Sequence, residues 1–347
     1  MTEKTGKKVD IVAVANAAKV SPSTVSRAFN HPDLVSPATR KRINRAVERL
    51  GYIRNRAAQA IHGRRNATIG LIVPTINHAI FAEVIQSFSD AIDAAGFTLL
   101  IASHGYALDR EYDMIRKLME HRVDGIALVG LEHSEATMRL LRRQDTPCIA
   151  IWSYSDRSDM ACVGADNHDA GRLAARHLLE AGHRDIGLIF PRVEGNDRAR
   201  DRLQGATAEM AAHGVVLRDA WWRESPYSIT LAKQAVREVL AAGPGPTAFL
   251  CGNDVIAQGA VFGVQAAGLS VPGDVSVIGI GDFKGSADME PGLTTVRIPA
   301  EDIGRIAGQR LTEAIVGDQD AVFRYRCELD VIVRSTTRAA DAPDTAG

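Results

Sequence analysis

The chain has 347 residues, 46% hydrophobic and 24% charged, which is the composition of an ordinary globular protein long enough for two or three domains. No apolar run approaches the roughly 20 residues of a membrane span, and the first ten residues lack the apolar segment of a signal peptide, so we expect a cytoplasmic protein without membrane contact. Its four cysteines form no Cys-x-x-Cys pair. They are expected to be buried free thiols, and no metal or cofactor is expected.

The first 66 residues and the rest of the chain carry opposite net charges. Residues 1–66 hold 14 Lys/Arg against 4 Asp/Glu, whereas the remaining residues hold 27 of the 41 basic and 38 of the 42 acidic residues. A concentrated basic segment attracts a polyanion, and the acidic remainder limits non-specific binding. The pattern therefore favours double-stranded DNA as a partner of the first segment.

The basic segment begins with three short predicted helices, each preceded by a good N-cap residue. They are Ile11–Ala18 after Asp10, Pro22–Phe29 after Ser21, and a third helix from Pro37 after Ser36 that stops at Gly51. Lys19 lies in the turn between the first two. Three such helices around a small core are typical of a helix-turn-helix domain, whose second helix lies in the major groove of DNA.

The second helix turns a polar side outward. Val25 and Phe29, four residues apart, should face inward. The outward side chains are of the types that contact phosphates and base edges, and the candidate DNA-binding residues are Ser21, Pro22, Ser23, Thr24, Ser26, Arg27 and Asn30. A small helical bundle used for protein contacts is the alternative, which the charge asymmetry disfavours.

A short helix-permissive segment, Arg56–His62, follows the three helices. Seven residues do not hold a helix alone, so we expect the segment to order against a partner chain or in a minor groove. Arg54 and Arg56 would meet phosphates, Asn55 is a further candidate DNA contact, and Ile61 is a candidate apolar wedge between base steps. A plain interdomain linker is the alternative.

Beyond Thr68, apolar runs alternate with helical patterns. The predicted strands are Ile69–Val73, Thr98–Ala102, Gly125–Val129 and Cys148–Trp152, then, after a break at Cys162–Ala165, Asp185–Phe190, Ala248–Cys251 and Val275–Ile280. The predicted helices include Phe81–Ala95, Arg110–His121, Ala170–Ala181, Arg198–His213 and Ser228–Ala242. This alternation predicts an α/β fold with parallel sheets, and about ten units are too many for one sheet, so two lobes are expected.

Ligands of such sheets bind beyond the carboxyl ends of the strands. Aromatic, amide and charged residues occur at those positions, which suits a small polar molecule. The candidate effector-binding residues are Asn77, Ile80, Phe81, Trp152, Arg202, Tyr227, Asn253 and Asp282. A core role is the alternative for the three aromatic residues, and a surface charge is the alternative for Arg202. No nucleophile elbow, zinc motif or phosphate loop occurs, so catalysis is not expected.

The chain resembles the LacI/GalR family of bacterial transcription repressors from about Asp10 to Arg338. The resemblance is carried by Val20–Arg27, Val35–Arg40, Leu50–Tyr52 with Asn55, Val123–Gly125, Gly182–His183, Pro246–Ala248, Asn253–Asp254 and Leu293–Thr295. It implies a helix-turn-helix headpiece at 1–52, a hinge helix at 53–66, a two-lobed periplasmic-binding-protein-like core for effector binding and dimerisation at 67–338, and a disordered tail at 339–347. It also implies a homodimer on a pseudo-palindromic operator.

The resemblance also assigns roles to single residues. Pro22 and Ser23 fall where the family reads operator bases, with Arg27 beside them. Ile61 falls on the apolar hinge residue that opens a base step, usually leucine in the family, and Ala58 falls on the small residue near it. Effector-binding positions of the family match Arg202, in Arg202-Leu-Gln-Gly205, and also Phe81, Tyr227 and Asn253.

Two departures from the family concern the effector. Trp152 stands where sugar-binding members often have aspartate, and Gly281 stands where most have the aspartate of Gly-Tyr-Asp, although Asp282 follows. The stretch Pro74–Tyr112 resembles gluconate repressors. We therefore expect a repressor controlled by a small sugar or sugar acid held by Arg202. A solute-binding module without DNA binding is the alternative, and it would predict a signal peptide and no basic headpiece.

Overall fold

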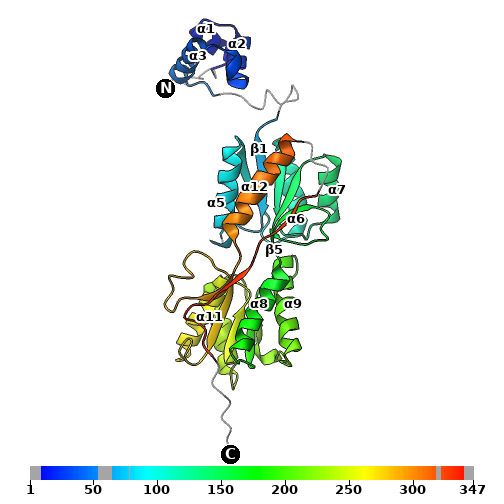
Figure 1. Ribbon diagram of the computed structural model, residues 1–347, viewed down its shortest axis with the longest axis vertical. Helices are drawn as coiled ribbons and strands as arrows, with labels where there is room; N and C mark the ends of the chain where they lie inside the picture. Colours follow the sequence, from blue (N-terminus) through cyan, green and yellow to red (C-terminus); the bar gives the residue numbers. More distant parts are fainter. Residues whose placement is uncertain (1–8, 54–64, 78, 318–321, 340–347) are drawn as a thin grey trace, which may run out of the picture. The chain divides into compact units, whose positions relative to one another are not determined.

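The computed structural model describes residues 9–53, 65–77, 79–317 and 322–339. The chain forms two compact units, residues 1–66 and 67–347, which we describe separately (Figure 1). The boundary between the units lies between Asn66 and Ala67. The predicted hinge segment and tail lie largely outside the described residues.

The first unit contains the three predicted helices, α1 (Ile11–Ala18), α2 (Pro22–Asn30) and α3 (Pro37–Leu50), and a short 3-10 turn at Pro32–Leu34. Their caps are those that the sequence predicts, because the side chains of Asp10, Ser21 and Ser36 accept hydrogen bonds from Ala13 N, Thr24 N and Thr39 N. Lys19, in the turn, is left-handed with φ 54°.

The core of this unit is small. Val25 is buried as predicted, and Phe29 is half-buried and stacks on Tyr52 with ring centroids 6.3 Å apart. The buried apolar residues are Val14, Ala15, Ala18, Val25, Ile43 and Ala46. Inward residues on all three helices fix α2 and leave its opposite side to solvent.

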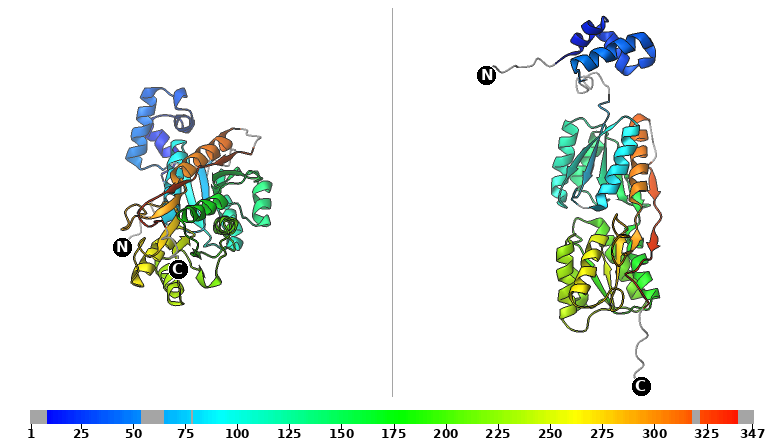
Figure 2. Two further views of the ribbon diagram at one scale, coloured as in Figure 1. Left: turned by 60° about the horizontal axis from the view of Figure 1, so that its bottom comes forward. Right: turned by 90° about the vertical axis from the view of Figure 1, so that its left-hand side faces the viewer.

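The second unit consists of two α/β lobes, each built on a six-stranded sheet (Figure 2). The first sheet is parallel throughout, in the order β11-β5-β4-β3-β1-β2. Its strands are β1 (Thr68–Val73), β2 (Thr98–Ser103), β3 (Gly125–Val129), β4 (Cys148–Ser153), β5 (Ala161–Ala165) and β11 (Arg324–Arg326). Helices α5 (Ala79–Ala94) and α12 (Ala300–Val316) cover one face, and α6 (Leu108–Glu120) and α7 (Glu135–Arg143) cover the other.

The second sheet has the order β12-β10-β9-β8-β6-β7, with only β12 antiparallel to its neighbour. Its strands are β6 (Ile186–Phe190), β7 (Trp222–Glu224), β8 (Ala248–Cys251), β9 (Ser276–Gly281), β10 (Thr294–Arg297) and β12 (Asp330–Ile332). Helices α8 (Asn167–Glu180) and α9 (Asp197–Ala212) cover one face, and α10 (Ile229–Ala241) and α11 (Asp254–Ala266) cover the other. A short 3-10 turn, Asp219–Trp221, precedes β7.

Two glycines let α8 and α9 approach closely. A Cβ on Gly171 would overlap the carbonyl oxygen of Arg202, and a Cβ on Gly205 would overlap that of His168. This packing brings the middle of α9 against the start of α8. Arg202 is therefore held beside Asn167, the first residue of α8.

Some sequence predictions need correction. The expected break at Cys162–Ala165 is part of strand β5, whose residues from Cys162 to Ala165 are buried like those of its neighbours. This segment has small side chains and includes a glycine, so its sequence gives only a weak strand pattern. Hydrogen bonding to β4 and β11 makes it a strand. All four cysteines are free, but Cys148 is only half-buried.

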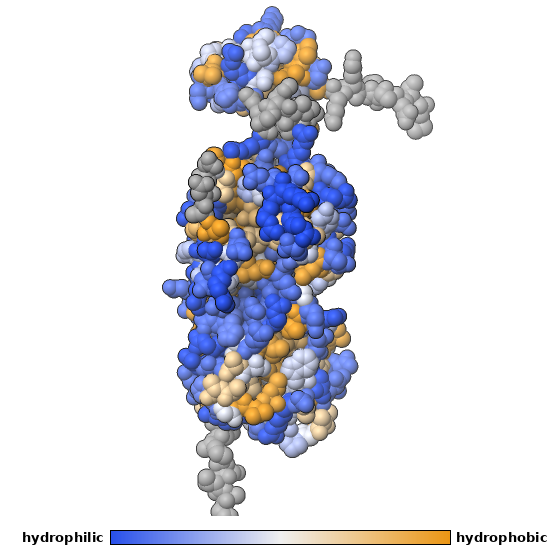
Figure 3. Space-filling view, turned by 90° about the vertical axis from the view of Figure 1, so that its right-hand side faces the viewer, coloured by the Kyte–Doolittle hydropathy of each residue, from blue (hydrophilic) through white to orange (hydrophobic). Residues whose placement is uncertain are grey.

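The face of the second unit that Figure 3 shows is mainly hydrophilic. Figure 3 shows one face, on which apolar patches on both lobes are separated by polar side chains. None of the helices in the described ranges is long and apolar enough to cross a membrane.

Candidate functional sites in the headpiece and between the core lobes

The exposed side of α2 carries a cluster of hydroxyl groups. The Ser21 hydroxyl lies 2.7 Å from that of Ser23 and 2.8 Å from that of Thr24. Ser21, Pro22, Ser23 and Arg27 are exposed, whereas Thr24 is half-buried. The predicted DNA-binding residues of α2 therefore include a contiguous group that a DNA groove could reach.

The last two predicted residues of α2 differ from this group. Ser26 and Asn30 are half-buried, and the Asn30 amide donates a hydrogen bond of 3.2 Å to the Ser26 hydroxyl. Their polar groups are thus engaged within the helix. The predicted hinge contacts at Arg54, Asn55, Arg56, Ala58 and Ile61 lie outside the described residues and stay predictions.

In the second unit, an aromatic pair lies at the end of the first sheet. Trp152, the fifth residue of β4, packs edge-on against Phe81 of α5 with ring centroids 5.8 Å apart. Both are buried, and Trp152 has φ 79°, a left-handed backbone that bulky residues rarely adopt. The Trp152 Nε1–H is buried without a hydrogen-bond partner among the described residues.

Arg202 extends from α9 of the second lobe and is only 2% exposed. Its Nε donates to Asn167 Oδ1 at 2.8 Å and its Nη1 donates to the Gly252 carbonyl at 3.0 Å. Its Nη2 is buried and has no partner in the described part of the chain. Burial lowers the pKa of Arg202 to about 10, so it stays a cation at neutral pH. The surface-charge alternative is therefore wrong.

Two asparagines of the second lobe add further unpartnered atoms. Asn253 caps α11 through its Oδ1, which accepts from Ile256 N at 3.0 Å, and its Nδ2 is left without a partner among the described residues. Asn196 donates through its Nδ2 to the hydroxyl of Tyr227 at 2.9 Å, and its Oδ1 is likewise left without a described partner. Tyr227 in turn lies 5.7 Å from Tyr106 of the first lobe, measured between ring centroids.

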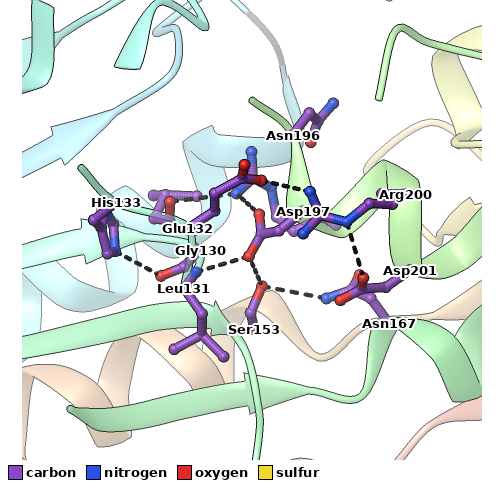
Figure 4. Close-up of polar contacts among 12 residues, drawn as sticks. Gly130, Leu131, Glu132, His133, Ser153, Asn167, Asn196, Asp197, Arg200 and Asp201 are labelled. Carbon is purple, nitrogen blue, oxygen red and sulfur yellow. Dashed lines mark hydrogen bonds and ion pairs between the residues drawn. The ribbon is translucent and has the colours of Figure 1, made fainter. Parts of the chain in front are cut away.

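Asp197, the first residue of α9, joins the two lobes (Figure 4). Its carboxylate accepts a hydrogen bond of 2.7 Å from Leu131 N, beyond the end of β3, and one of 3.3 Å from the Ser153 hydroxyl at the end of β4. Its neighbour Arg198 pairs with it at 2.6 Å. Burial opposes the charge of Asp197, but Arg198 and the backbone donors more than offset this and lower the pKa of the carboxyl.

A second group of contacts supports the Asp197 contact. Arg200 of α9 forms an ion pair of 2.7 Å with Glu132 of the first lobe. Behind the loop, the buried ring of His133 lies between Glu111, 2.9 Å from its Nδ1, and the Gly130 carbonyl, 3.1 Å from its Nε2. The loop that receives Asp197 is therefore fixed from both sides.

Two predicted effector-binding residues are not part of this arrangement. The Asp282 carboxylate, 8% exposed, forms ion pairs of 2.7 Å with Arg297 and with Arg334, so it is not a free acceptor for a ligand. Asn77 is exposed in the loop after β1. The side chain of Ile80 lies outside the described residues.

Sequence reasoning missed Asn167, Asn196, Asp197 and Arg198. All four lie at or just before the start of a helix that follows a strand, which is the signal that could have found them. In sequence, hydrophilic residues at such positions look like ordinary helix caps. Only the tertiary structure shows that they lie opposite another lobe.

Comparison with known proteins agrees with this architecture. Residues 10–55 match the model for bacterial regulatory proteins of the lacI family, and residues 175–337 match a periplasmic binding protein-like domain. The HTH-type transcriptional regulator GntR of Escherichia coli is 32% identical over 309 residues, covering 88% of this chain and 91% of that protein. The chain belongs to the lacI family.

Two further comparisons extend over most of the chain. Catabolite control protein A of Priestia megaterium is 29% identical over 88% of this chain and 92% of its own length. A crystal structure of the Lac repressor dimer bound to operator and the anti-inducer ONPF has a TM-score of 0.85, with 26% identity, and covers 96% of this chain and all of that one. The similarity therefore includes both the headpiece and the two-lobed core.

Proposed function

We propose that this protein is a sequence-specific DNA-binding repressor of transcription, which acts as a cytoplasmic homodimer and is controlled by a small effector bound between the core lobes. The proposal rests on the presence of two features in one chain. A basic helix-turn-helix unit exposes Ser21, Pro22, Ser23 and Arg27, and a two-lobed core buries polar atoms that have no partner among the described residues. The relatives' names and the operator-bound dimer support the same assignment.

The effector role rests on buried donors. An unpartnered buried N–H loses its hydrogen bond to water without compensation, so three such groups favour a bound molecule that accepts from them. Trp152, Arg202 and Asn253 supply these groups, and none is a nucleophile or a general base at neutral pH. We therefore infer binding without catalysis, as the names of the relatives suggest.

The test is selection of the operator from randomised duplex DNA by the full chain, followed by fluorescence anisotropy on the selected sequence. We expect Arg45→Glu, on the exposed side of α3, to reduce affinity strongly, because a reversed charge repels the phosphates. Arg143→Glu, at an exposed position of α7 in the core, is the matched control and should leave affinity unchanged. Equal loss in both variants, or no selected consensus, would contradict the proposal.

A further inference from the structure

The buried ring of His133 faces a hydrogen-bond acceptor at each of its two nitrogens. Its Nδ1 lies 2.9 Å and 3.1 Å from the two carboxylate oxygens of Glu111, and its Nε2 lies 3.1 Å from the Gly130 carbonyl oxygen (Figure 4). The side chains of His133 and Glu111 are only 1% and 2% exposed. Water therefore has little access to replace either contact.

The chemistry of these acceptors determines how many protons the ring carries. A carbonyl oxygen only accepts hydrogen bonds, so Nε2 of His133 needs a proton to bind Gly130. Nδ1 needs one as well, because an ionised carboxylate such as Glu111 also only accepts, and a neutral imidazole would turn its lone pair toward that carboxylate. Rotation of the ring by half a turn about its Cβ–Cγ bond would place ring carbons at both contacts and lose both bonds.

The charges buried around the ring call for the same proton. Two buried acids lie here, Glu111 and Asp197, and Arg198 already pairs with Asp197 at 2.6 Å. Arg110, on α6, is exposed to solvent. A buried charge is costly unless an opposite charge pairs with it. An imidazolium at His133 supplies the partner that the Glu111 carboxylate needs.

His104, the second histidine of this cluster, cannot take that role as easily. It is buried, its Nδ1 has no hydrogen-bond partner among the described residues, and burial lowers its pKa below the ordinary 6.5. The charged groups that act on it are Glu111 and Arg110 of α6, Arg198 of α9, and His133. A second proton on His104 would leave a buried N–H unpaired, so His133 is the ring that pairs with Glu111.

The loop formed by residues 130–133 carries two contacts from the first lobe to the second. Leu131 N donates to the Asp197 carboxylate at 2.7 Å, and Glu132 forms an ion pair of 2.7 Å with an arginine of α9. The ring of His133 closes this loop through the carbonyl at the other end and ties it to α6. The position of both contacts therefore depends on the bonds of one ring.

We propose that His133 is doubly protonated at neutral pH, and that its ion pair with Glu111 positions the loop for the contacts between the lobes. Loss of the proton would turn a lone pair toward either Glu111 or the Gly130 carbonyl, and one of the two bonds would be lost. The contact of Leu131 with the second lobe is thus linked to a proton. His133 is a positioning residue, because it acts on the second lobe through Leu131. The proposal concerns the chain by itself and stands whether or not the proposed function holds.

Nuclear magnetic resonance on the full chain, labelled with ¹⁵N in histidine, measures the charge of the ring. The chemical shifts of the two ring nitrogens show how many protons the ring carries, and backbone correlations identify His133 without a variant. We expect at least about two thirds of the His133 rings to carry both protons at about pH 7, against about a quarter for a histidine with an ordinary pKa near 6.5. A predominantly neutral His133 ring at this pH would overturn the proposal.

Glu111→Gln separates the charge from the shape of the contact. A glutamine amide donates to Nδ1, so a neutral ring then satisfies both contacts, and we expect His133 to lose its second proton while the loop keeps its position. Glu120→Gln, at an exposed position of the same helix where the glutamate pairs with Arg116, is the control and should leave the ring as in the wild type. An equally protonated ring in Glu111→Gln and in the wild type would contradict the pairing with Glu111.

The backbone amide of Leu131 reports the link to the second lobe. Its ¹H–¹⁵N signal is followed while the pH is raised from about 7 until His133 loses its second proton. In the wild type the amide signal should shift with the same midpoint as the ring signals. In Glu111→Gln the ring is already neutral, so the amide signal should stay in place. A wild-type amide signal that stays in place while the ring loses its proton would overturn the positioning role.

Discussion

Single residues determine how the two core lobes meet. Gly130 has φ +94°, and a Cβ at this position would overlap Arg198 Nη1 and lie 2.7 Å from Asp197 Oδ1. Only a glycine leaves room for the Asp197 carboxylate beside Leu131 N. The absence of a side chain at Gly130 thus matters as much to this contact as the charges of the two residues that approach it.

Gly130→Ala should therefore weaken effector binding about tenfold or more, because the Asp197 contact between the lobes would have to shift. Operator affinity without effector should stay within about twofold, since the headpiece is a separate unit. The measurement is calorimetry with the effector together with anisotropy on operator DNA.

Gly96→Ala is the control for Gly130→Ala. Gly96 has φ +82°, and a Cβ added to it would have nothing within 4 Å, so the substitution imposes the same backbone strain without the contact between lobes. An equal effect of the two substitutions on effector affinity would show that strain, and not crowding at Asp197, is responsible.

At the scale of elements, two serines perform the same structural task in different places. Ser21 caps α2 and Ser36 caps α3, each through a hydrogen bond from the backbone N–H three residues later. Only Ser21 also belongs to the exposed hydroxyl cluster with Ser23 and Thr24. Comparison of the two separates helix stability from DNA contact.

Ser21→Ala and Ser36→Ala should each destabilise the headpiece by about 1 kcal/mol, as loss of an N-cap does. Ser21→Ala should in addition reduce operator affinity beyond the loss shown by Ser36→Ala. Thermal unfolding followed by circular dichroism and anisotropy on operator DNA measure the two effects. Equal losses of operator affinity would indicate that Ser21 acts on DNA only through the helix.

One buried histidine should make the stability of the core depend on pH. His183 is buried among Thr247, Ser276 and the Arg338 carbonyl, and burial lowers its pKa from the ordinary 6.5. Below pH 6.5 the unfolded chain therefore binds more protons than the folded chain, so this residue's contribution to stability falls as the pH falls. Burial lowers the pKa of His104 and His177 in the same direction.

Urea unfolding should accordingly show a less stable core at about pH 5.5 than at about pH 7.5. His183→Gln should reduce this difference, because glutamine does not titrate. An unchanged difference in that variant would assign the effect to the other two buried histidines.

At the scale of the whole molecule, charge is segregated between the two units. A headpiece with 14 basic and 4 acidic residues, attached to a core rich in acid, should bind DNA with a steep salt dependence. A plot of the logarithm of the binding constant against the logarithm of the salt concentration should be linear. Its slope should be about −0.9 for each phosphate that the protein neutralises. Arg45→Glu should flatten this slope, whereas Ser23→Ala should change the selected sequence and keep the slope.

Features that depend on neighbouring residues could be predicted from the amino-acid sequence. The caps at Asp10, Ser21 and Ser36, the turn at Lys19 and the buried apolar strands follow from local chemistry, and the structure contains them. The charge division of the chain and the parallel α/β pattern of the core are likewise properties of composition and order along the chain.

The use of each polar group, in contrast, depends on contacts between distant parts of the chain. Asp282 and Arg202 looked like equal candidates in sequence, but Asp282 is held by two arginines from distant positions and Arg202 is buried with one nitrogen unpartnered among the described residues. In sequence, Asp197 looks like any other first residue of a helix. In the structure, the loop after β3 lies opposite it and donates a hydrogen bond to its carboxylate. Burial and long-range pairing set the energy of a polar group, and neither is encoded in its immediate sequence neighbours.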